Sequence, residues 1–484
     1  MRSEIVLESL RQHAIDRPAA PAFIADGKAT SYAEFAEYSD GVRRAVAGAC
    51  LSPDSPVGIV VPKSPPAVAT AVGAALAGHA PFLPSTSLGP DALRRALDVA
   101  GAGGLVRAAG SAVERREAAR GRADAAVVFT TSGSTGTPKV VPLPAAGVES
   151  FLRWSSTAFE IGPGSVVLSL APLSFDLSLL DVWATLRSGG TVVLPDTEQS
   201  TDGGYLADLI HTTRPEVVQS VPFFLRLIGA GLDLRRLPPG FDSVRHLILT
   251  GDKLPGELLS RIPGLFPRAA VYNVYGCTET NDSFLHRITD FDLPPGAEVP
   301  IGAPIPGVTA RITGADGREL VGAATGELSV HTPFQTSGYS DPAAGADRFE
   351  LVDGPAGPIR FYRTGDVVHR DANGLVYLRG RSDWVVKVRG VRTDLQEIEA
   401  VLQSHPLIDE VAVLADHDEV EGHRLRAEIR VFGGSRINSL QARTHCANAL
   451  PVTAVPSTFT ISDTPLPRTS TGKIDRRRLV RNHR

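Results

Sequence analysis

The sequence predicts an α/β protein, with a large N-terminal domain of α/β sheets, a small barrel-like subdomain, and a small, mobile α+β C-terminal domain. Three observations lead to this prediction. The chain has 484 residues, which is more than one ordinary domain needs. Short β-branched segments alternate with helical segments as far as Pro294, a pattern typical of βαβ units and a largely parallel sheet. Beyond Pro294, glycine- and aspartate-rich turns separate the strands, and the last part of the chain has a pattern of its own.

The elements of the N-terminal domain are predicted from caps and apolar runs. Ser31 has the residue type and position of an N-cap, and an amphipathic helix follows it as far as Ala47. Residues 67–77 form an alanine-rich run that predicts a buried helix. The wider apolar run is interrupted by glycines, His79 and Pro81, so it does not predict a membrane-spanning helix. Strands are expected at residues 57–61, 126–129, 166–170, 191–194, 217–220, 247–250 and 271–274.

The end of the chain predicts a second domain. Strands at residues 309–313, 326–330 and 374–378 suggest an antiparallel or barrel-like subregion of the first domain. The charged run RGRSD then precedes a short strand at 385–388, and we place the domain boundary there, with domains at 1–382 and 383–484. In the second domain we expect helices at 395–404 and 439–450 and strands at 410–415 and 425–432.

Composition excludes several classes of function. The 49 basic and 53 acidic residues leave a net charge of −4, which argues against a nucleic-acid-binding protein and a membrane-attracted one. Cys50, Cys277 and Cys446 form no CxxC pair, so the sequence predicts neither a disulfide framework nor a zinc site. The N-terminus has acidic residues where an export signal needs an apolar core. We therefore expect a cytoplasmic protein.

The most informative segment is the loop at residues 130–139, with the sequence TTSGSTGTPK. It follows the apolar strand at 126–129 and combines glycines, hydroxyls and one lysine. Glycines let the backbone approach an anion, N–H and O–H groups donate hydrogen bonds to oxygens, and the lysine adds charge. The pattern GxxxxGK[ST] of the Walker loop is absent. The segment predicts phosphate binding of another kind.

Six motifs in order make the chain resemble the adenylate-forming superfamily, which includes acyl-CoA synthetases, luciferases and the adenylation domains of nonribosomal peptide synthetases. The phosphate loop is the first motif. The others are NVYGCTE at 273–279, GEL at 326–328 with GY at 338–339, YRTGD at 362–366, GRSD through KVRG at 380–390 with EIE at 397–399, and PRT with GKIDR at 467–476. The resemblance covers most of the chain and implies a stand-alone amino acid adenylation enzyme that uses ATP and Mg²⁺.

The resemblance implies a role for each motif. The loop residues that would hold the β- and γ-phosphates are Thr131, Ser132, Gly133, Ser134, Thr135, Gly136 and Lys139. Thr278 would contact the α-phosphate, and Glu279 would be the Mg²⁺ ligand, since Mg²⁺ prefers carboxylate oxygen. The nucleoside would be held by Asn273, Tyr275 and Gly276 at the adenine and by Asp366 and Arg381 at the ribose.

The C-terminal motifs imply a lysine that acts in one of two half-reactions. Lys473 would bridge the substrate carboxylate and the α-phosphate, a contact made in the transition state. The small domain would rotate about Asp383 for the second half-reaction, thioester formation. Lys387 and Gly390 would lie on the face presented in that step.

The choice of substrate is predicted from the segment SFDLS at 174–178. Amino-acid-activating members have Phe-Asp here, so Asp176 would pair with the substrate ammonium, because a carboxylate beside an apolar pocket needs a cationic partner. The remaining pocket residues are expected to be Leu177, Leu180, Ser220, Ile248, Thr250, Val274, Asp282 and Ser283. This lining favours alanine, serine, glycine, or a short diamino or β-amino acid. If Asp282 faces the cavity, it would favour a substrate with a second amino group. If Asp282 turns outward, the substrate would be a small neutral amino acid.

We expect an amino acid:carrier protein ligase of natural-product biosynthesis. Its partner would be a separate carrier protein that bears a phosphopantetheine thiol. Two alternatives are a CoA ligase for a small carboxylic acid and a non-catalytic nucleotide-binding member. The basic C-terminal end, with Arg476 to Arg478, is a candidate docking site for an acidic carrier. Two departures from the family pattern are Cys277 in place of proline, which we interpret as a packing residue, and Thr332 in place of glycine.

Overall fold

The computed structural model describes residues 4–86, 88–110, 112–117, 122–131, 139–235, 240–254, 256–294, 297–345, 347–355, 357–381, 384–388, 391–418, 422–450, 454–469 and 472–481. The chain forms two compact units. Unit 1 comprises Met1–Arg311, Ser329–Thr364 and Arg370–Tyr377, and unit 2 comprises Ile312–Leu328, Gly365–His369 and Leu378–Arg484. The expected boundary at residue 383 lies outside the described residues and stays a prediction.

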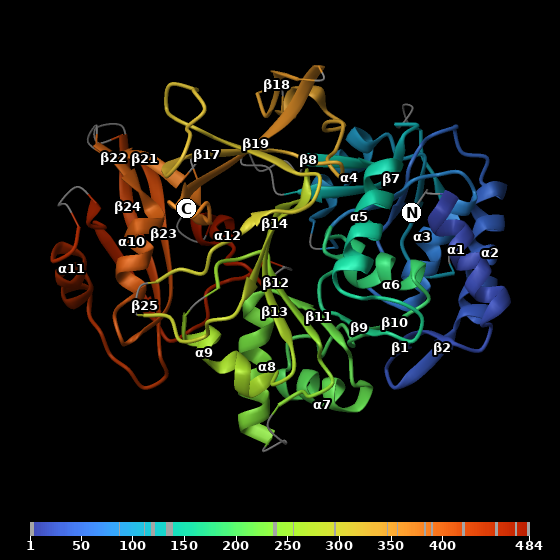
Figure 1. Ribbon diagram of the computed structural model, residues 1–484, viewed down its shortest axis with the longest axis horizontal. Coiled ribbons are helices and arrows are strands. Elements are labelled where there is room, and N and C mark those ends of the chain that lie inside the picture. The colour runs from blue at the N-terminus through green and yellow to red at the C-terminus, as the bar shows by residue number, and fades with distance from the viewer. Residues whose placement is uncertain are drawn as a thin grey trace. The chain divides into compact units, whose positions relative to one another are not determined.

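Unit 1 contains a nine-stranded sheet in the order β15-β14-β13-β12-β11-β9-β10-β1-β2 (Figure 1). Its strands are β1 (Pro21–Ala25), β2 (Lys28–Ser31), β9 (Val166–Ser169), β10 (Thr191–Leu194), β11 (Val217–Ser220), β12 (His246–Thr250), β13 (Ala270–Cys277), β14 (Asn281–Ile288) and β15 (Ala303–Pro304). Strands β1, β10, β9, β11, β12 and β13 pair in parallel, and the edge strands β2, β14 and β15 pair antiparallel. The parallel centre of this sheet confirms the βαβ pattern expected from the sequence.

A second sheet of unit 1 has six strands in the order β6-β5-β3-β4-β7-β8. These strands are β3 (Val57–Ile59), β4 (Pro81–Leu83), β5 (Gly104–Val106), β6 (Glu114–Arg115), β7 (Ala125–Thr131) and β8 (Lys139–Pro144). β3, β4, β5 and β7 pair in parallel, whereas β8 runs antiparallel to β7. The expected phosphate loop therefore connects two neighbouring antiparallel strands.

The helices of unit 1 pack on these sheets. They are α1 (Glu4–Asp16), α2 (Tyr32–Gly48), α3 (Pro65–Leu76), α4 (Pro90–Ala100), α5 (Ala145–Ala158), the π-helix η1 (Leu179–Ala184), α6 (Thr185–Arg187), α7 (Gly203–Thr213), α8 (Pro222–Arg235) and α9 (Gly256–Leu265). Ser31 caps α2 and forms a capping box with Glu34, as the sequence predicts. Helix α3 is buried along most of its length, and a side chain at Gly73 would meet Val42 of α2 at 2.6 Å. The two helices can pack this closely only because Gly73 has no side chain.

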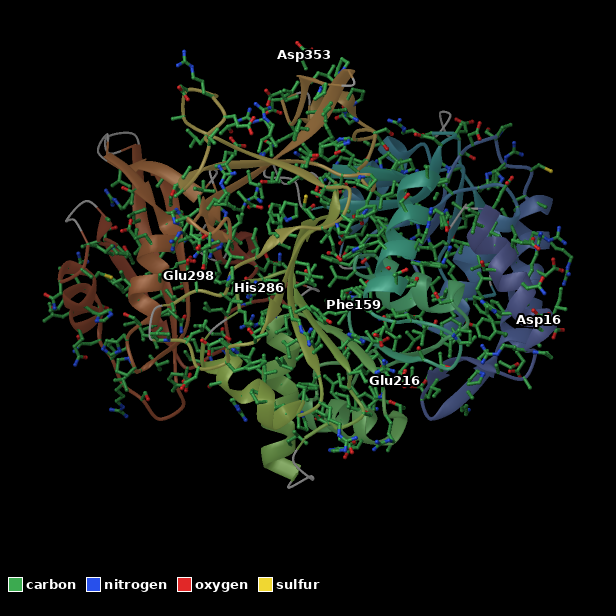
Figure 2. The ribbon with its side chains drawn as sticks, in the orientation of Figure 1. Asp16, Phe159, Glu216, His286, Glu298 and Asp353 are labelled. Carbon is green, nitrogen blue, oxygen red and sulfur yellow. The ribbon has the colours of Figure 1, made fainter. Side chains whose placement is uncertain are left out.

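The core of unit 1 is aromatic and aliphatic. Phe159, labelled in Figure 2, is completely buried and lies edge-on to Tyr272 of β13, with ring centroids 5.4 Å apart. Trp183 of η1 is also completely buried. His286, labelled in the same figure, belongs to β14 and pairs with Asn273 of β13. Phe159 and β14 therefore both pack against β13, the third strand from one edge of the nine-stranded sheet.

A five-stranded sheet contains β16 (Thr309–Thr313), β17 (Ala324–His331), β18 (Phe349–Gly354), β19 (Gly357–Arg370) and β20 (Val376–Arg381). Strands are paired in the order β16-β17-β19-β18, and β20 also pairs with β19. A short 3-10 helix, η2 (Pro342–Gly345), precedes β18. This sheet is the subregion expected after Pro294, and the division between the two units falls within four of its strands.

The remainder of unit 2 is an α+β structure. Its elements are β21 (Val385–Val388), β22 (Val391–Asp394), α10 (Leu395–Gln403), β23 (Ile408–Asp418), β24 (Gly422–Val431), α11 (Ser439–Ala447), β25 (Thr458–Ser462) and α12 (Arg476–Arg481). Strands β23, β24 and β25 form one sheet, and α10 and α11 pack on it (Figure 1). Ile398 and Leu402 of α10 are completely buried in this core. The expected helices and strands of the small domain are confirmed.

Within the described part of the chain, no helix combines the length and the apolar character that crossing a membrane requires.

Candidate active site

The carboxyl ends of three parallel strands define one edge of the nine-stranded sheet. Ser169, Ser220 and Thr250 are the last residues of β9, β11 and β12 and are all buried. In open α/β sheets, ligands bind outside this edge. Of the other predicted pocket residues, Leu180, Ile248, Val274 and Ser283 are buried, and Leu177 is half-buried. Leu180, Ile248 and Val274 belong to the main hydrophobic core.

Asp176 lies in a tight turn between β9 and η1. The Phe175 N–H donates to the carbonyl of Pro172 at 3.0 Å, and the Leu179 N–H donates to the carbonyl of Asp176 at 2.8 Å. The Ser178 hydroxyl donates to the carbonyl of Phe175 at 2.6 Å. This turn gives the Asp176 backbone a fixed conformation beside the carboxyl edge, where the sequence places a substrate-binding residue.

A half-buried lysine and a buried carboxylate near this turn were not predicted from the sequence. Lys63, from the loop after β3, donates through Nζ to the carbonyls of Ser169 at 2.7 Å and Ala171 at 2.6 Å, and to the Ser169 hydroxyl at 2.6 Å. Asp181 of η1 is completely buried. Burial lowers the pKa of Lys63, and burial raises the pKa of Asp181, while each charge opposes the shift of the other. Lys63 thus ties the end of β9 to the start of the segment that carries Asp176.

Asp282 lies opposite Gly276 in the β13–β14 pair. Burial, together with the negative charge of Asp176, raises the pKa of Asp282 to about 8. Asp176 therefore lies close enough for its negative charge to raise the pKa of Asp282. Asp282 is accordingly a group whose charge state changes near physiological pH.

In the chain, the expected phosphate loop lies between β7 and β8. Residues 132–138, which include Ser132, Gly133, Ser134, Thr135 and Gly136, lie outside the described residues. Thr131 is the last residue of β7, and Lys139 is the first residue of β8. The two residues are directly opposite each other in the antiparallel pair. Lys139 is half-buried, and its Nζ lies 4.8 Å from the ring centroid of Tyr339. A cation over an aromatic face is an attractive contact that orients the ammonium group.

Glu279 is at the centre of a buried hydrogen-bond network. The Tyr339 hydroxyl donates to Oε1 of Glu279 at 2.7 Å and lies 3.0 Å from the hydroxyl of Tyr362. Burial and the charge of Glu279 raise the pKa of both tyrosines well above the ordinary value, so both phenols keep their protons. Tyr339 lies in the GY motif and Tyr362 in the YRTGD motif, but the sequence analysis predicted no role for either side chain.

The backbone around Glu279 is also fixed. The Thr336 N–H donates to the carbonyl of Glu279 at 2.8 Å, and the Thr332 hydroxyl donates to the carbonyl of Thr280 at 3.0 Å. Thr332, which departs from the family pattern, thus braces the turn that carries Glu279. The Sγ of Cys277 lies 3.1 Å from the hydroxyl of Thr280, a local contact in keeping with a packing role.

The predicted adenine-binding residues lie along β13 and the turn after it. The Asn273 amide donates to the carbonyl of Pro300 at 2.8 Å, and Tyr275 lies edge-on to Phe284 with ring centroids 5.9 Å apart. A side chain at Gly276 would come within 2.3 Å of the carbonyl oxygen of Asn281. Glycine is therefore required here by the close approach of β14. Thr278 is half-buried in the same turn.

Unit 2 contains the predicted ribose-binding residues. Asp366 of β19 is buried and accepts a hydrogen bond from Nη1 of Arg381 at 3.1 Å. The structure therefore brings these two residues together. Asp383 and Gly390 lie outside the described residues, and only the backbone of Lys387, in β21, is described.

Lys473 is exposed in a short hairpin that precedes α12. The Thr469 N–H donates to the carbonyl of Lys473 at 2.7 Å, and the Gly472 N–H donates to the carbonyl of Thr469 at 3.0 Å. Gly472 has a φ of 80°, which glycine adopts without strain. The hairpin presents the lysine side chain away from the core of its unit.

The basic C-terminal end is less available for docking than the sequence suggests. Arg476 donates through Nη2 to Glu399 at 2.8 Å and through Nη1 to the carbonyl of Val413 at 2.9 Å. Its guanidinium also lies 4.7 Å from the ring centroid of Trp384. Arg478 is exposed. Arg476 is thus committed to contacts within its unit, whereas the side chain of Arg477 lies outside the described residues, so the docking hypothesis rests on Arg477 and Arg478.

No group of three or more histidine, cysteine, aspartate or glutamate side chains suited to a metal is present among the described residues. Mg²⁺ is commonly bound by one or two carboxylates together with substrate phosphates. The buried carboxylate of Glu279, which Tyr339 links to Lys139, is compatible with that mode of binding.

Comparisons with known proteins agree with this geometry. The model of the AMP-binding enzyme family matches residues 10–123 and 104–340, and that of the AMP-binding enzyme C-terminal domain matches residues 397–473. An L-proline--[L-prolyl-carrier protein] ligase of Streptomyces coelicolor is 34% identical over 74% of this chain and 66% of its own length. A D-alanine--D-alanyl carrier protein ligase of Bacillus licheniformis is 25% identical over 98% of both chains.

Solved structures share the fold. NpsA of Klebsiella oxytoca, in complex with 3-hydroxyanthranilyl-AMSN, matches with a TM-score of 0.79 and 23% identity over 100% of this chain and 99% of its own. The o-succinylbenzoate CoA synthetase MenE of Bacillus subtilis, in complex with AMP, matches with a TM-score of 0.79 and 22% identity over 97% of each chain. With family models that span most of its length, the chain belongs to the AMP-binding enzyme family.

Proposed function

We propose that this protein is an amino acid:carrier protein ligase. It activates a small or polar amino acid with ATP to give aminoacyl-AMP and pyrophosphate, and then transfers the aminoacyl group to the phosphopantetheine thiol of a separate carrier protein. The observation that carries this proposal is the placement of Asp176 at the carboxyl edge of the nine-stranded sheet, where a carboxylate is suited to an α-ammonium group. The amino acid–carrier ligases among the relatives support it.

Several groups of the chain prepare the first half-reaction. Lys139 neutralises phosphate charge, and the Tyr339 hydroxyl orients the carboxylate of Glu279, which would hold Mg²⁺. When bound, the metal neutralises charge on the phosphate oxygens. Thr278 contacts the α-phosphate, and Asp366 accepts hydrogen bonds from the ribose. Catalysis of this kind consists mainly of positioning and electrostatic stabilisation.

The second half-reaction needs a different arrangement of the small domain. We propose that Asp383 is the hinge and that Lys387 and Gly390 face the thioester-forming site after rotation. We also propose that the reaction takes place in the cytoplasm as part of natural-product biosynthesis. The three cysteines are free thiols, which is consistent with a reducing compartment.

Amino-acid-dependent ATP–pyrophosphate exchange tests the proposal. The panel contains alanine, serine, glycine, short diamino acids, β-amino acids and, since one relative is named for it, proline. Exchange with one amine-bearing acid, followed by loading of a carrier protein and not of free CoA, is the expected result. Exchange only with acids that lack an amine, or thioester formation on CoA, would replace the proposal with a CoA ligase.

Asp176→Ala is expected to raise the KM for the amino acid by about a hundredfold while leaving the KM for ATP unchanged. The reason is that the substrate ammonium loses a charged partner, and a buried charged hydrogen bond contributes about 1.5–3 kcal/mol. Steady-state exchange at varied amino acid and ATP concentrations measures both constants. Asp208→Ala, an aspartate on the outer helix α7, is the control. An unchanged amino acid KM in the Asp176 variant would contradict the assignment.

Asp282→Asn is expected to raise the melting temperature by a few degrees at pH 9 and by a smaller amount at pH 5. Folding raises the pKa of Asp282 from its ordinary value to about 8. Between these values the folded state holds a proton that the unfolded state has lost, so the contribution of Asp282 to stability falls as the pH rises. Asparagine does not titrate and avoids this loss. Thermal unfolding from pH 5 to pH 9 measures the difference, and a constant difference would contradict it.

A further inference from the structure

The hairpin that presents Lys473 is held by a side chain whose role the sequence did not reveal. Arg468 begins the hairpin and forms an isolated β-bridge with Ile474. Its Nη1 donates to the carbonyl oxygen of Gly472 at 2.6 Å. That carbonyl belongs to the peptide bond that links Gly472 to Lys473. The guanidinium thus contacts the backbone immediately before the lysine.

The other arm of the guanidinium is anchored in the sheet of unit 2. Nη2 of Arg468 donates to Oε1 of Glu410, on β23, at 2.5 Å. Glu410 is a buried carboxylate, 7% exposed. Its Oε2 accepts the N–H of Leu466 at 3.0 Å, and its Oε1 also accepts Nη1 of Arg430 from β24 at 3.2 Å. Glu410 therefore accepts three hydrogen bonds, two from the segment at 466–468 and one from β24.

The hairpin has a second anchor at its far end. Arg476, three residues after Lys473, donates to Glu399 of α10 at 2.8 Å, and Glu399 accepts the N–H of Val413 of β23 at 2.6 Å. Arginine–carboxylate contacts therefore hold the chain on both sides of Lys473. Between them, the side chain of Lys473 itself is exposed.

We propose that Arg468 and Glu410 are positioning residues for Lys473 in the adenylation half-reaction. Neither contacts the substrate. Glu410 orients the guanidinium, and the guanidinium fixes the peptide bond before Lys473, so the ammonium explores fewer positions before it meets the substrate. The inference rests on the proposed function, in which Lys473 acts on the carboxylate and the α-phosphate.

The chemistry of arginine is what this role requires. Its planar group donates in two directions from a rigid fork, whereas lysine is a point charge on a flexible chain. Replacing Arg468 by lysine keeps a positive charge near Glu410, but the hydrogen bond to the carbonyl of Gly472 is lost. Misplacing a catalytic group by about 1 Å can reduce a rate by about a hundredfold. The effect should therefore fall on kcat for adenylation.

The test uses the full chain with Arg468→Lys and Glu410→Gln. We expect each variant to lower kcat for amino-acid-dependent pyrophosphate exchange by about tenfold or more, with unchanged KM for ATP and for the amino acid. Carrier loading from supplied aminoacyl-AMP, which bypasses adenylation, should keep its wild-type rate. In the Lys473→Ala background, Arg468→Lys should cause no further loss, since there is no lysine left to position.

Arg443→Lys is the matched control. Arg443 belongs to the same unit and also donates to a backbone carbonyl, that of Ser457 at 2.7 Å, but it does not contact the hairpin. It should leave kcat unchanged. Normal exchange in both test variants, slowed loading from supplied adenylate, or a further loss in the Lys473→Ala background would overturn the inference. Absence of exchange in the wild-type protein would instead contradict the proposed function itself.

Discussion

Lys473→Ala is expected to lower amino-acid-dependent ATP–pyrophosphate exchange by about a hundredfold or more, because removing one stabilising donor from a transition state costs about that much. KM for ATP should change little, since the contact is made mainly in the transition state. The hairpin should keep its conformation, because its hydrogen bonds use the backbone of Lys473 and not its side chain.

Two comparisons make this prediction specific. Lys253→Ala removes an exposed lysine, paired with Glu298 on the surface of unit 1, and should not change the exchange rate. Carrier loading from supplied aminoacyl-AMP should survive in the Lys473 variant, because the lysine serves only the first half-reaction. Exchange near the wild-type rate would mean that Lys473 has been assigned wrongly.

Lys63→Met is expected to destabilise the protein by about 1.5–3 kcal/mol, because it removes the hydrogen bonds that the ammonium donates to Ser169 and Ala171 and the positive charge that favours the ionised form of buried Asp181. It also frees the carbonyls of Ser169 and Ala171 at the start of the segment that carries Asp176. Urea unfolding measures the first effect, and the KM for the amino acid, which should rise, measures the second.

A double variant separates the charge effect from the loss of packing. Replacing both partners, Lys63→Met with Asp181→Leu, should recover much of the stability, because no unpaired charge remains. Arg44→Gln, which breaks an exposed pair with Asp40, should cost about 1 kcal/mol or less. Equal destabilisation in the Lys63 single variant and the double variant would show that the charge of Lys63 does not offset the burial of Asp181.

The sequence was a good guide to elements and motifs. Strand β10 and strand β11 have the bounds expected from the sequence, and the cap at Ser31 is where it was predicted. These features depend on residues close together in the chain, where apolar periodicity and capping chemistry act. The motif around Glu279 likewise falls in one short turn between two strands.

Contacts between distant segments could not be predicted. Lys63 meets Ser169 across 106 positions, and Tyr339 meets Glu279 across 60. No local pattern reports such pairs, because the fold alone decides which loops come together. The π-helix that buries Asp181 was missed for a similar reason. π-helices are rare and occur mostly as single turns joined to α-helices, as η1 is joined to α6, so the sequence pattern predicts only a helix here.

Trp384 gives unit 2 a natural optical reporter. It is the residue after the proposed hinge, and its indole lies under the guanidinium of Arg476. The chain has three tryptophans, and the other two, Trp154 and Trp183, belong to unit 1. With those two replaced by phenylalanine, the emission of the protein would come from the segment beside the hinge. A rotation of the small domain could then be followed in real time as a change in fluorescence, without any attached dye.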